Sequence, residues 1–136
     1  MSANPYASKL SEYTQVSAHA GVAAADPHKL ILMLMDGALE RVANARGCML
    51  RNDTAQKAQL IHRSVCIIGE LKASLDLKAG GSIASNLHQL YDYMTQKLMQ
   101  GSLRNSVTDL EEVSKLLGQI REAWMQVPGK LPGAPK

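Results

Sequence analysis

Six consecutive apolar residues, Leu-Ile-Leu-Met-Leu-Met at positions 30–35, constrain the fold of this chain most strongly. They follow Asp26 and Pro27, a pair typical of the first residues of a helix. Successive side chains on a helix are about 100° apart, so six apolar residues cover its whole circumference. A surface helix needs only one apolar stripe. This helix is therefore expected to be covered on more than one side.

Composition is typical of one helical domain. The chain has 136 residues, of which 46% are hydrophobic and 20% charged, with seven Met and no Phe. Leu, Ala and Met favour helices, and Met-rich surfaces adapt to the shape of a partner. The net charge of +3 is spread along the chain rather than gathered into a basic stripe. This pattern does not favour binding to nucleic acid.

Each of four expected helices begins at a side chain that can cap its first turn. The expected spans are 26–51, 53–77, 82–101 and 106–127, with caps at Asp26, Asp53, Ser82 and Ser106. Gly80 and Gly81 separate the second helix from the third, and strand signals are essentially absent. Helices of this length joined by short turns predict an all-α fold, an antiparallel four-helix bundle over residues 26–127.

The two ends of the chain differ from the bundle. Residues 1–25 form an N-terminal arm, helical or extended, in which Tyr6, Leu10 and Tyr13 follow the helical spacing i, i+4, i+7. Residues 128–136 are rich in Pro and Gly and are expected to be a disordered tail.

The third and fourth helices each carry one apolar stripe, which is expected to be core. On the third helix it comprises Ile83, Leu87, Leu90, Tyr91, Met94 and Leu98. On the fourth it comprises Leu110, Val113, Leu116, Leu117, Ile120, Trp124 and Val127.

The first two helices carry more apolar residues than a single stripe needs. Their expected core stripes are Ile31, Leu34, Ala38, Val42, Ala45 and Met49, and Ala58, Ile61, Val65 and Ile68. The additional residues are Leu32, Leu39, Ala43 and Leu50 on the first helix, and Leu60, Ile67 and Leu71 on the second. Two interpretations stay open. The additional residues pack under the arm or in an uneven bundle, or they form a groove for an amphipathic helix of a partner.

No constellation typical of catalysis is present. The four histidines, His19, His28, His62 and His88, lack metal-site spacing, and no Gly-rich phosphate loop follows a strand. Cys48 and Cys66 lie in apolar stretches and are expected to be buried, reduced thiols. We therefore expect a protein that is not an enzyme and that has neither a cofactor nor a metal site.

The sequence shows no export signal, and six residues is its longest apolar run. A membrane-spanning helix needs about 20. A cytoplasmic protein that does not insert into a membrane is therefore expected.

Several stretches resemble the flagellin export chaperones of the FliS family. They are Asp-Pro-His-Lys-Leu-Ile at 26–31, Asp-Gly-Ala at 36–38, Leu-Tyr-Asp-Tyr-Met at 90–94, Leu-Arg-Asn at 103–105, Glu-Glu-Val at 111–113 and Glu-Ala-Trp at 122–124. The resemblance covers about residues 9–127. The sequence departs from the family pattern at Gln96-Lys97, where an Arg pair is common, and at Met35, where an aromatic residue is common.

The resemblance implies a cytosolic helical bundle that binds the disordered C-terminal segment of flagellin. It also implies that the protein prevents premature polymerisation and delivers flagellin to a membrane protein of the flagellar type III export gate. Leu10 and Tyr13 match arm residues that contact this gate. From the apolar pattern we expect flagellin contacts at Leu32, Leu39, Leu60, Ile67, Leu71 and Tyr93.

The alternative to a chaperone is a structural homo-oligomer, for instance a homodimer. In that protein the additional apolar face would be a self-interface. A third hypothesis, a basic helical protein that binds nucleic acid, is disfavoured by the even distribution of charge.

Overall fold

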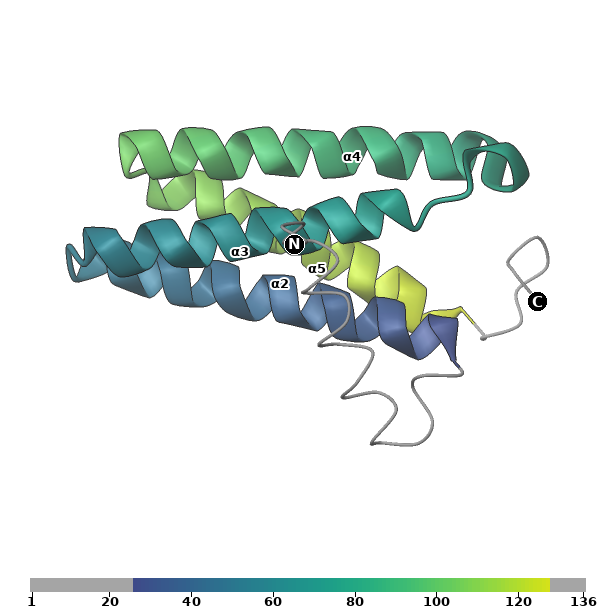
Figure 1. Cartoon of the computed structure of the whole chain (residues 1–136), viewed down its shortest axis with the longest axis horizontal. Helices are drawn as coiled ribbons and strands as arrows, with labels where there is room; N and C mark the ends of the chain where they lie inside the picture. Colours follow the sequence, from purple (N-terminus) through teal and green to yellow (C-terminus); the bar gives the residue numbers. More distant parts are fainter. Residues whose placement is uncertain (1–25, 128–136) are drawn as a thin grey trace, which may run out of the picture.

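The computed structural model describes residues 26–127, which form four helices and no strand. They are α2 (Pro27–Leu50), α3 (Thr54–Ala73), α4 (Leu77–Arg104) and α5 (Val107–Gln126). Each helix packs against two others, in the cyclic order α2, α3, α4, α5 (Figure 1). The predicted all-α four-helix bundle is confirmed. The expected arm 1–25 and tail 128–136, including the conformation of the arm, lie outside the described residues.

Contacts at both ends of the α2–α5 and α3–α4 pairs show that these helices run antiparallel. At one end of the α2–α5 pair His28 contacts Trp124, and at the other Arg46 pairs with Glu111. Between α3 and α4, Lys57 contacts Ser102 and Lys72 pairs with Asp92.

Three of the four predicted caps are confirmed. The Asp26 carboxylate accepts hydrogen bonds from the backbone N–H groups of His28 and Lys29. Asp53 and Ser106 each accept one from the residue three positions later. These side chains satisfy N–H groups that have no partner inside the helix.

The α3–α4 connection differs from the prediction. The second helix ends at Ala73, four residues before the predicted Leu77, and Asp76 caps α4 in place of Ser82. One helical turn precedes the predicted glycine break, which is confirmed at Gly81 (φ 58°, ψ −135°). This φ is positive, a region that glycine adopts without the steric cost of a Cβ.

The core contains the predicted stripes of α4 and α5 almost in full. Its buried side chains include Tyr91, Met94, Leu98, Leu110, Val113 and Leu117. Ile83 is an exception, because it lies just after the interruption at Gly81 and is 71% exposed. The predicted α2 stripe is also core, with Ile31 packed at its edge.

The prediction for α3 needs correction. Leu60, Ile67 and Leu71, expected to be additional apolar residues facing a groove, are core residues with 7%, 2% and 1% exposure. Ala58, expected in the core, is exposed. The reason is that α3 packs between α2 and α4, so two neighbours cover a wide arc of its surface.

Cys48 and Cys66 are both buried thiols, as predicted, and form no disulfide. Within residues 26–127, no helix has a stretch that is both long and apolar enough to span a membrane.

Candidate protein-binding surfaces

The additional apolar residues of α2 form a line that stays partly open. Leu32 and Leu39 are half-buried, Ala43 is exposed and Leu50 is 62% exposed. Helical geometry places all four on the side of α2 that also carries Asp36 and Arg46. The prediction that α2 has apolar surface beyond its core stripe is therefore confirmed.

Two ion pairs show that this side of α2 faces α5. Arg46 Nε lies 2.8 Å from Glu111 Oε2, and Arg121 Nε binds Asp36 Oδ1. The Arg46 and Glu111 side chains are 44% and 50% exposed. Ion pairs this exposed contribute at most about 1 kcal/mol each. Their main consequence here is to fix the register of α2 against α5.

Gly118 on α5 lies between these two ion pairs. It follows Glu111 by seven residues and precedes Arg121 by three, so it shares their side of the helix. A Cβ built at Gly118 would meet no atom within 4 Å, so the space above it is open. We call the set Leu32, Leu39, Ala43, Leu50 and Gly118 the α2–α5 surface.

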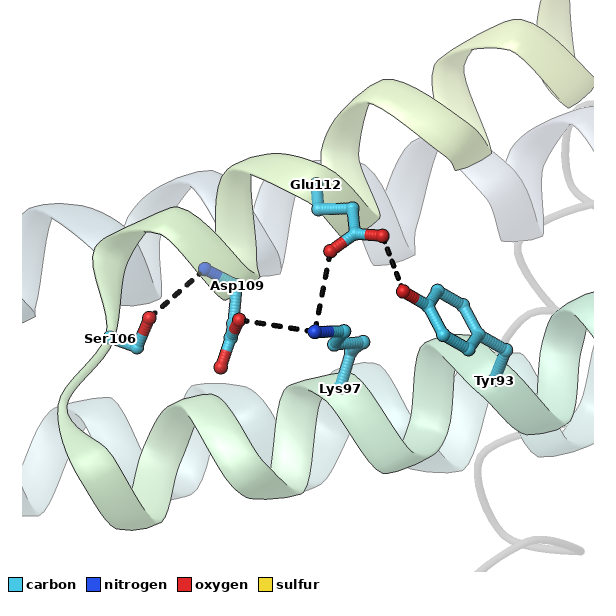
Figure 2. Close-up of polar contacts among 5 residues, drawn as sticks. All are labelled: Tyr93, Lys97, Ser106, Asp109 and Glu112. Atoms are coloured by element: carbon cyan, nitrogen blue, oxygen red, sulfur yellow. Dashed lines mark hydrogen bonds and ion pairs between the residues drawn. The ribbon is translucent and has the colours of Figure 1, made fainter.

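Tyr93, the sixth expected contact, lies on a different surface, between α4 and α5 (Figure 2). Its side chain is 37% exposed, and its hydroxyl donates to Glu112 Oε2 at 2.5 Å. This hydrogen bond to the Glu112 carboxylate raises the pKa of Tyr93. The hydroxyl is therefore engaged within the bundle, and the ring is the part of Tyr93 that a partner can contact.

Lys97 holds the same cluster together. Its Nζ lies 3.5 Å from Asp109 Oδ1 and 3.5 Å from Glu112 Oε1, and 5.8 Å from the centre of the Tyr93 ring (Figure 2). The nearby Asp109 carboxylate is the largest cause of the raised pKa of Lys97. The cluster joins the C-terminal half of α4 to the first turns of α5.

Two histidines in the described part of the chain make contacts within the bundle. The His28 ring stacks on Trp124, and His88 Nδ1 lies 3.6 Å from Asp92 Oδ2. Lys72 also binds Asp92, and this hydrogen bond is the largest cause of the lowered pKa of that carboxyl group. Within residues 26–127, no three His, Cys, Asp or Glu side chains form a group that could hold a metal ion.

The structure thus brings Leu32 and Leu39 together, buries Leu60, Ile67 and Leu71, and places Tyr93 apart. Leu10 and Tyr13 lie outside the described residues. Sequence reasoning missed the contribution of α5 to the first surface, although a signal existed. Asp36 and Arg46 are ten residues apart on one helix, and Glu111 and Arg121 are ten apart on the other with charges in complementary order.

The fold and these surfaces define a small all-helical bundle with a partly exposed apolar side. Residues 9–131 match the family described as flagellar protein FliS. The chain belongs to the FliS family, whose curated members are named flagellar secretion chaperones.

Similarity to individual relatives extends over most of the chain. It is 44% identical to the flagellar secretion chaperone FliSB of Pseudomonas aeruginosa over 120 residues, which cover 88% of this chain and 95% of the relative. It is 44% identical to FliS of Salmonella typhimurium over 125 residues, covering 91% and 93%. With FliS of Bacillus subtilis the identity is 30% over 123 residues, covering 90% and 85%.

Proposed function

We propose that this protein binds the disordered C-terminal segment of flagellin in the cytosol, prevents its premature polymerisation and delivers it to the flagellar type III export gate. Membership of the FliS family supports a chaperone role. The observation that carries the binding proposal is the apolar line on α2, which the bundle leaves partly open beside α5.

The physical basis is coupled folding and binding. A disordered segment that becomes helical on the α2–α5 surface buries apolar area and loses conformational entropy at the same time. The entropy loss offsets part of the gain, so affinity falls below what the buried area alone would give. A chaperone benefits from this balance, because it must release its cargo at the gate.

Within this proposal Leu32 and Leu39 are the principal flagellin contacts, and the Tyr93 ring is a secondary one. Leu60, Ile67 and Leu71 hold α3 against its neighbours. They reach flagellin only if the bound segment displaces α3, so their contribution is mainly to the shape of the bundle.

Calorimetric titration with a synthetic flagellin C-terminal peptide tests the proposal. Leu39→Ser should weaken binding by roughly tenfold, because burial of one Leu is worth about 1.5–3 kcal/mol. Gly118→Leu should weaken it as well, since the new side chain occupies open space on the α2–α5 surface and removes no contact of the bundle.

Leu77→Ser is the matched control. Leu77 is 52% exposed and lies on α4, away from the α2–α5 surface, so this variant should bind like the unchanged protein. Full affinity in both Leu39→Ser and Gly118→Leu would place the flagellin site elsewhere. Far-UV circular dichroism of each variant confirms that the helices are intact.

The proposed gate contact involves the arm. Leu10→Ala with Tyr13→Ala should reduce binding to the cytoplasmic domain of the gate membrane protein and leave flagellin binding unchanged. If the arm also shields apolar surface, deletion of residues 2–17 should increase binding of a hydrophobic dye and speed flagellin association. Unchanged dye binding and unchanged association would refute the shielding role.

A homo-oligomer would use the same exposed residues differently. Light scattering separates the two functions, because a stable dimer that ignores added flagellin peptide supports a self-interface. A monomer, or a dimer that flagellin peptide dissociates, supports the chaperone.

A further inference from the structure

One end of the bundle contains a pocket that the proposed flagellin surface does not use. Its lining residues come from the α2–α3 turn and the α4–α5 turn, the two turns at the left of Figure 1. Its lining residues are Cys48, Met49, Asn52, Asp53, Thr54, Lys57 and Asn105. Most of these side chains are polar, which distinguishes the pocket from the apolar α2–α5 surface.

Lys57 is the charged group buried at this pocket. It is only 7% exposed, and its Nζ donates to the Ser102 carbonyl oxygen at 3.0 Å and to Asn105 Oδ1 at 3.1 Å. Both acceptors are neutral, and a lysine ammonium group has three N–H donors. No carboxylate within residues 26–127 forms an ion pair with Lys57. Buried cations normally have a charged partner, and a carboxylate is the group that would complement Lys57 best.

The charge around the pocket favours an acidic ligand. Residues 48–57 and 101–109, which contain the two turns, have three basic residues, Arg51, Lys57 and Arg104, and two acidic ones, Asp53 and Asp109. Asp109 is paired with Lys97. The Asp53 carboxylate already accepts the first-turn N–H of Gln56. Arg51 and Arg104 are exposed, and neither forms an ion pair in the described part of the chain. The basic side chains of this end outnumber the acidic ones by one, and none of the three forms an ion pair in the described part of the chain, so complementary charge favours an acidic partner here.

Two exposed leucines are next in sequence to residues that line the pocket or contact Lys57. Leu103, next to Ser102, is 89% exposed, and Leu50, next to Met49, is 62% exposed. Large apolar side chains this exposed near polar groups are typical of protein interfaces. Each offers an apolar side chain of a partner a place to pack while the partner's carboxylate enters the pocket.

We propose that this end of the bundle binds a segment of a second protein that presents an acidic side chain beside apolar residues. The carboxylate accepts the remaining N–H of Lys57, and the neighbouring apolar side chains pack against Leu103 and Leu50. This site goes beyond the proposed flagellin function, because it shares only Leu50 with the α2–α5 surface.

Titration of the ¹⁵N-labelled protein by NMR tests the proposal with a defined probe, the blocked pentapeptide acetyl-Glu-Leu-Leu-Glu-Leu-amide. Its amide shifts should concentrate in residues 48–57 and 101–108. The analogue with Gln in place of Glu should bind roughly tenfold more weakly, because it lacks the charge-assisted hydrogen bond. Binding of the acidic peptide should also weaken as salt is added.

Two exposed positions supply variants that should leave the fold intact, Leu103→Ser and Arg104→Gln. Their matched controls are Leu77→Ser and Lys78→Gln, which make the same kinds of change at the opposite end of α4. The first pair should weaken peptide binding by roughly fivefold or more, and the controls should not. Lys57→Gln should also weaken it. If Lys57→Gln fails to fold, the surface variants still decide the outcome.

Three results would overturn the proposal. The first is a set of shifts away from the two turns. The second is equal affinity for the Glu and Gln peptides, which would indicate an apolar partner. The third is a dimer in light scattering that Leu103→Ser dissociates, which would make the site an interface between copies of this chain.

Discussion

His28 and Trp124, 96 residues apart in sequence, bond to each other's backbone. The indole Nε1 of Trp124 donates to the His28 carbonyl oxygen at 3.0 Å, and His28 Nε2 donates to the Trp124 carbonyl oxygen at 2.7 Å. Their rings stack with centroids 4.9 Å apart. This reciprocal contact joins the first turn of α2 to the last turn of α5, where helices otherwise fray.

Trp124→Phe should therefore destabilise the bundle modestly. Phe retains an aromatic ring for stacking but has no N–H for the His28 carbonyl. The loss of this hydrogen bond should lower the free energy of unfolding by about 1 kcal/mol. Urea denaturation followed by far-UV circular dichroism measures it. Met125→Gln, an exposed change at the next residue, is the control and should stay within about 0.5 kcal/mol of the unchanged protein.

Two helical glycines should respond in opposite directions to alanine. At Gly101 on α4 a new Cβ would lie 2.8 Å from Leu110 Cδ1 and 3.0 Å from Asp109 Cβ on α5. Gly101→Ala should therefore destabilise the bundle by about 1–3 kcal/mol, because α4 and α5 must move apart.

Gly118→Ala is the matched change with open space around it. It should stabilise the bundle by up to about 1 kcal/mol, since alanine loses less backbone entropy in a helix than glycine. Parallel urea denaturation of the two variants measures both changes in the free energy of unfolding, a decrease for Gly101→Ala and an increase for Gly118→Ala. Equal effects would mean that the close approach of α4 to α5 at Gly101 carries no energetic cost.

The helices and most of the core follow from local features of the sequence. Caps such as Asp26, Asp53 and Ser106 depend on interactions within four residues, and the stripes of α4 and α5 each face one direction. The additional apolar residues could not be assigned in the same way. A wide apolar arc looks identical in sequence whether a neighbouring helix or a partner covers it. Leu60 and Ile67 are covered by neighbouring helices, whereas Leu32 and Leu39 are only half covered.

This difference changes what an aspartate at Ile67 should do. As a groove residue, Ile67 would tolerate the charge and lose only flagellin binding. As a core residue with 2% exposure, Ile67 should not tolerate the charge, because the carboxylate would be buried without a partner. Ile67→Asp should reduce the free energy of unfolding by about 4 kcal/mol or more and lower helicity in far-UV circular dichroism. Normal helicity would show that the α3 surface is open in solution.

Tyr91 should make the bundle sensitive to alkaline pH. Burial raises the pKa of this residue from 10.0 to about 12, because the phenolate is disfavoured in the core. Below pH 10 the hydroxyl is protonated in both folded and unfolded chains, and stability is unaffected. Between pH 10 and 12 the unfolded chain loses its proton while the folded chain keeps it, so stability falls as pH rises. A shift of this size corresponds to about 2–3 kcal/mol.

Urea midpoints measured at pH 9 and at pH 11.5 test this dependence. Tyr91→Phe should remove most of the difference between the two midpoints, because Phe has no proton to lose. Tyr93→Phe is the comparison. The pKa of Tyr93 is also raised, first by its hydrogen bond to Glu112 and then by desolvation, but Tyr93 is 37% exposed, so this variant should remove a smaller part of the difference than Tyr91→Phe. If Tyr91→Phe retains the full alkaline loss, other groups that lose protons in this range must cause it.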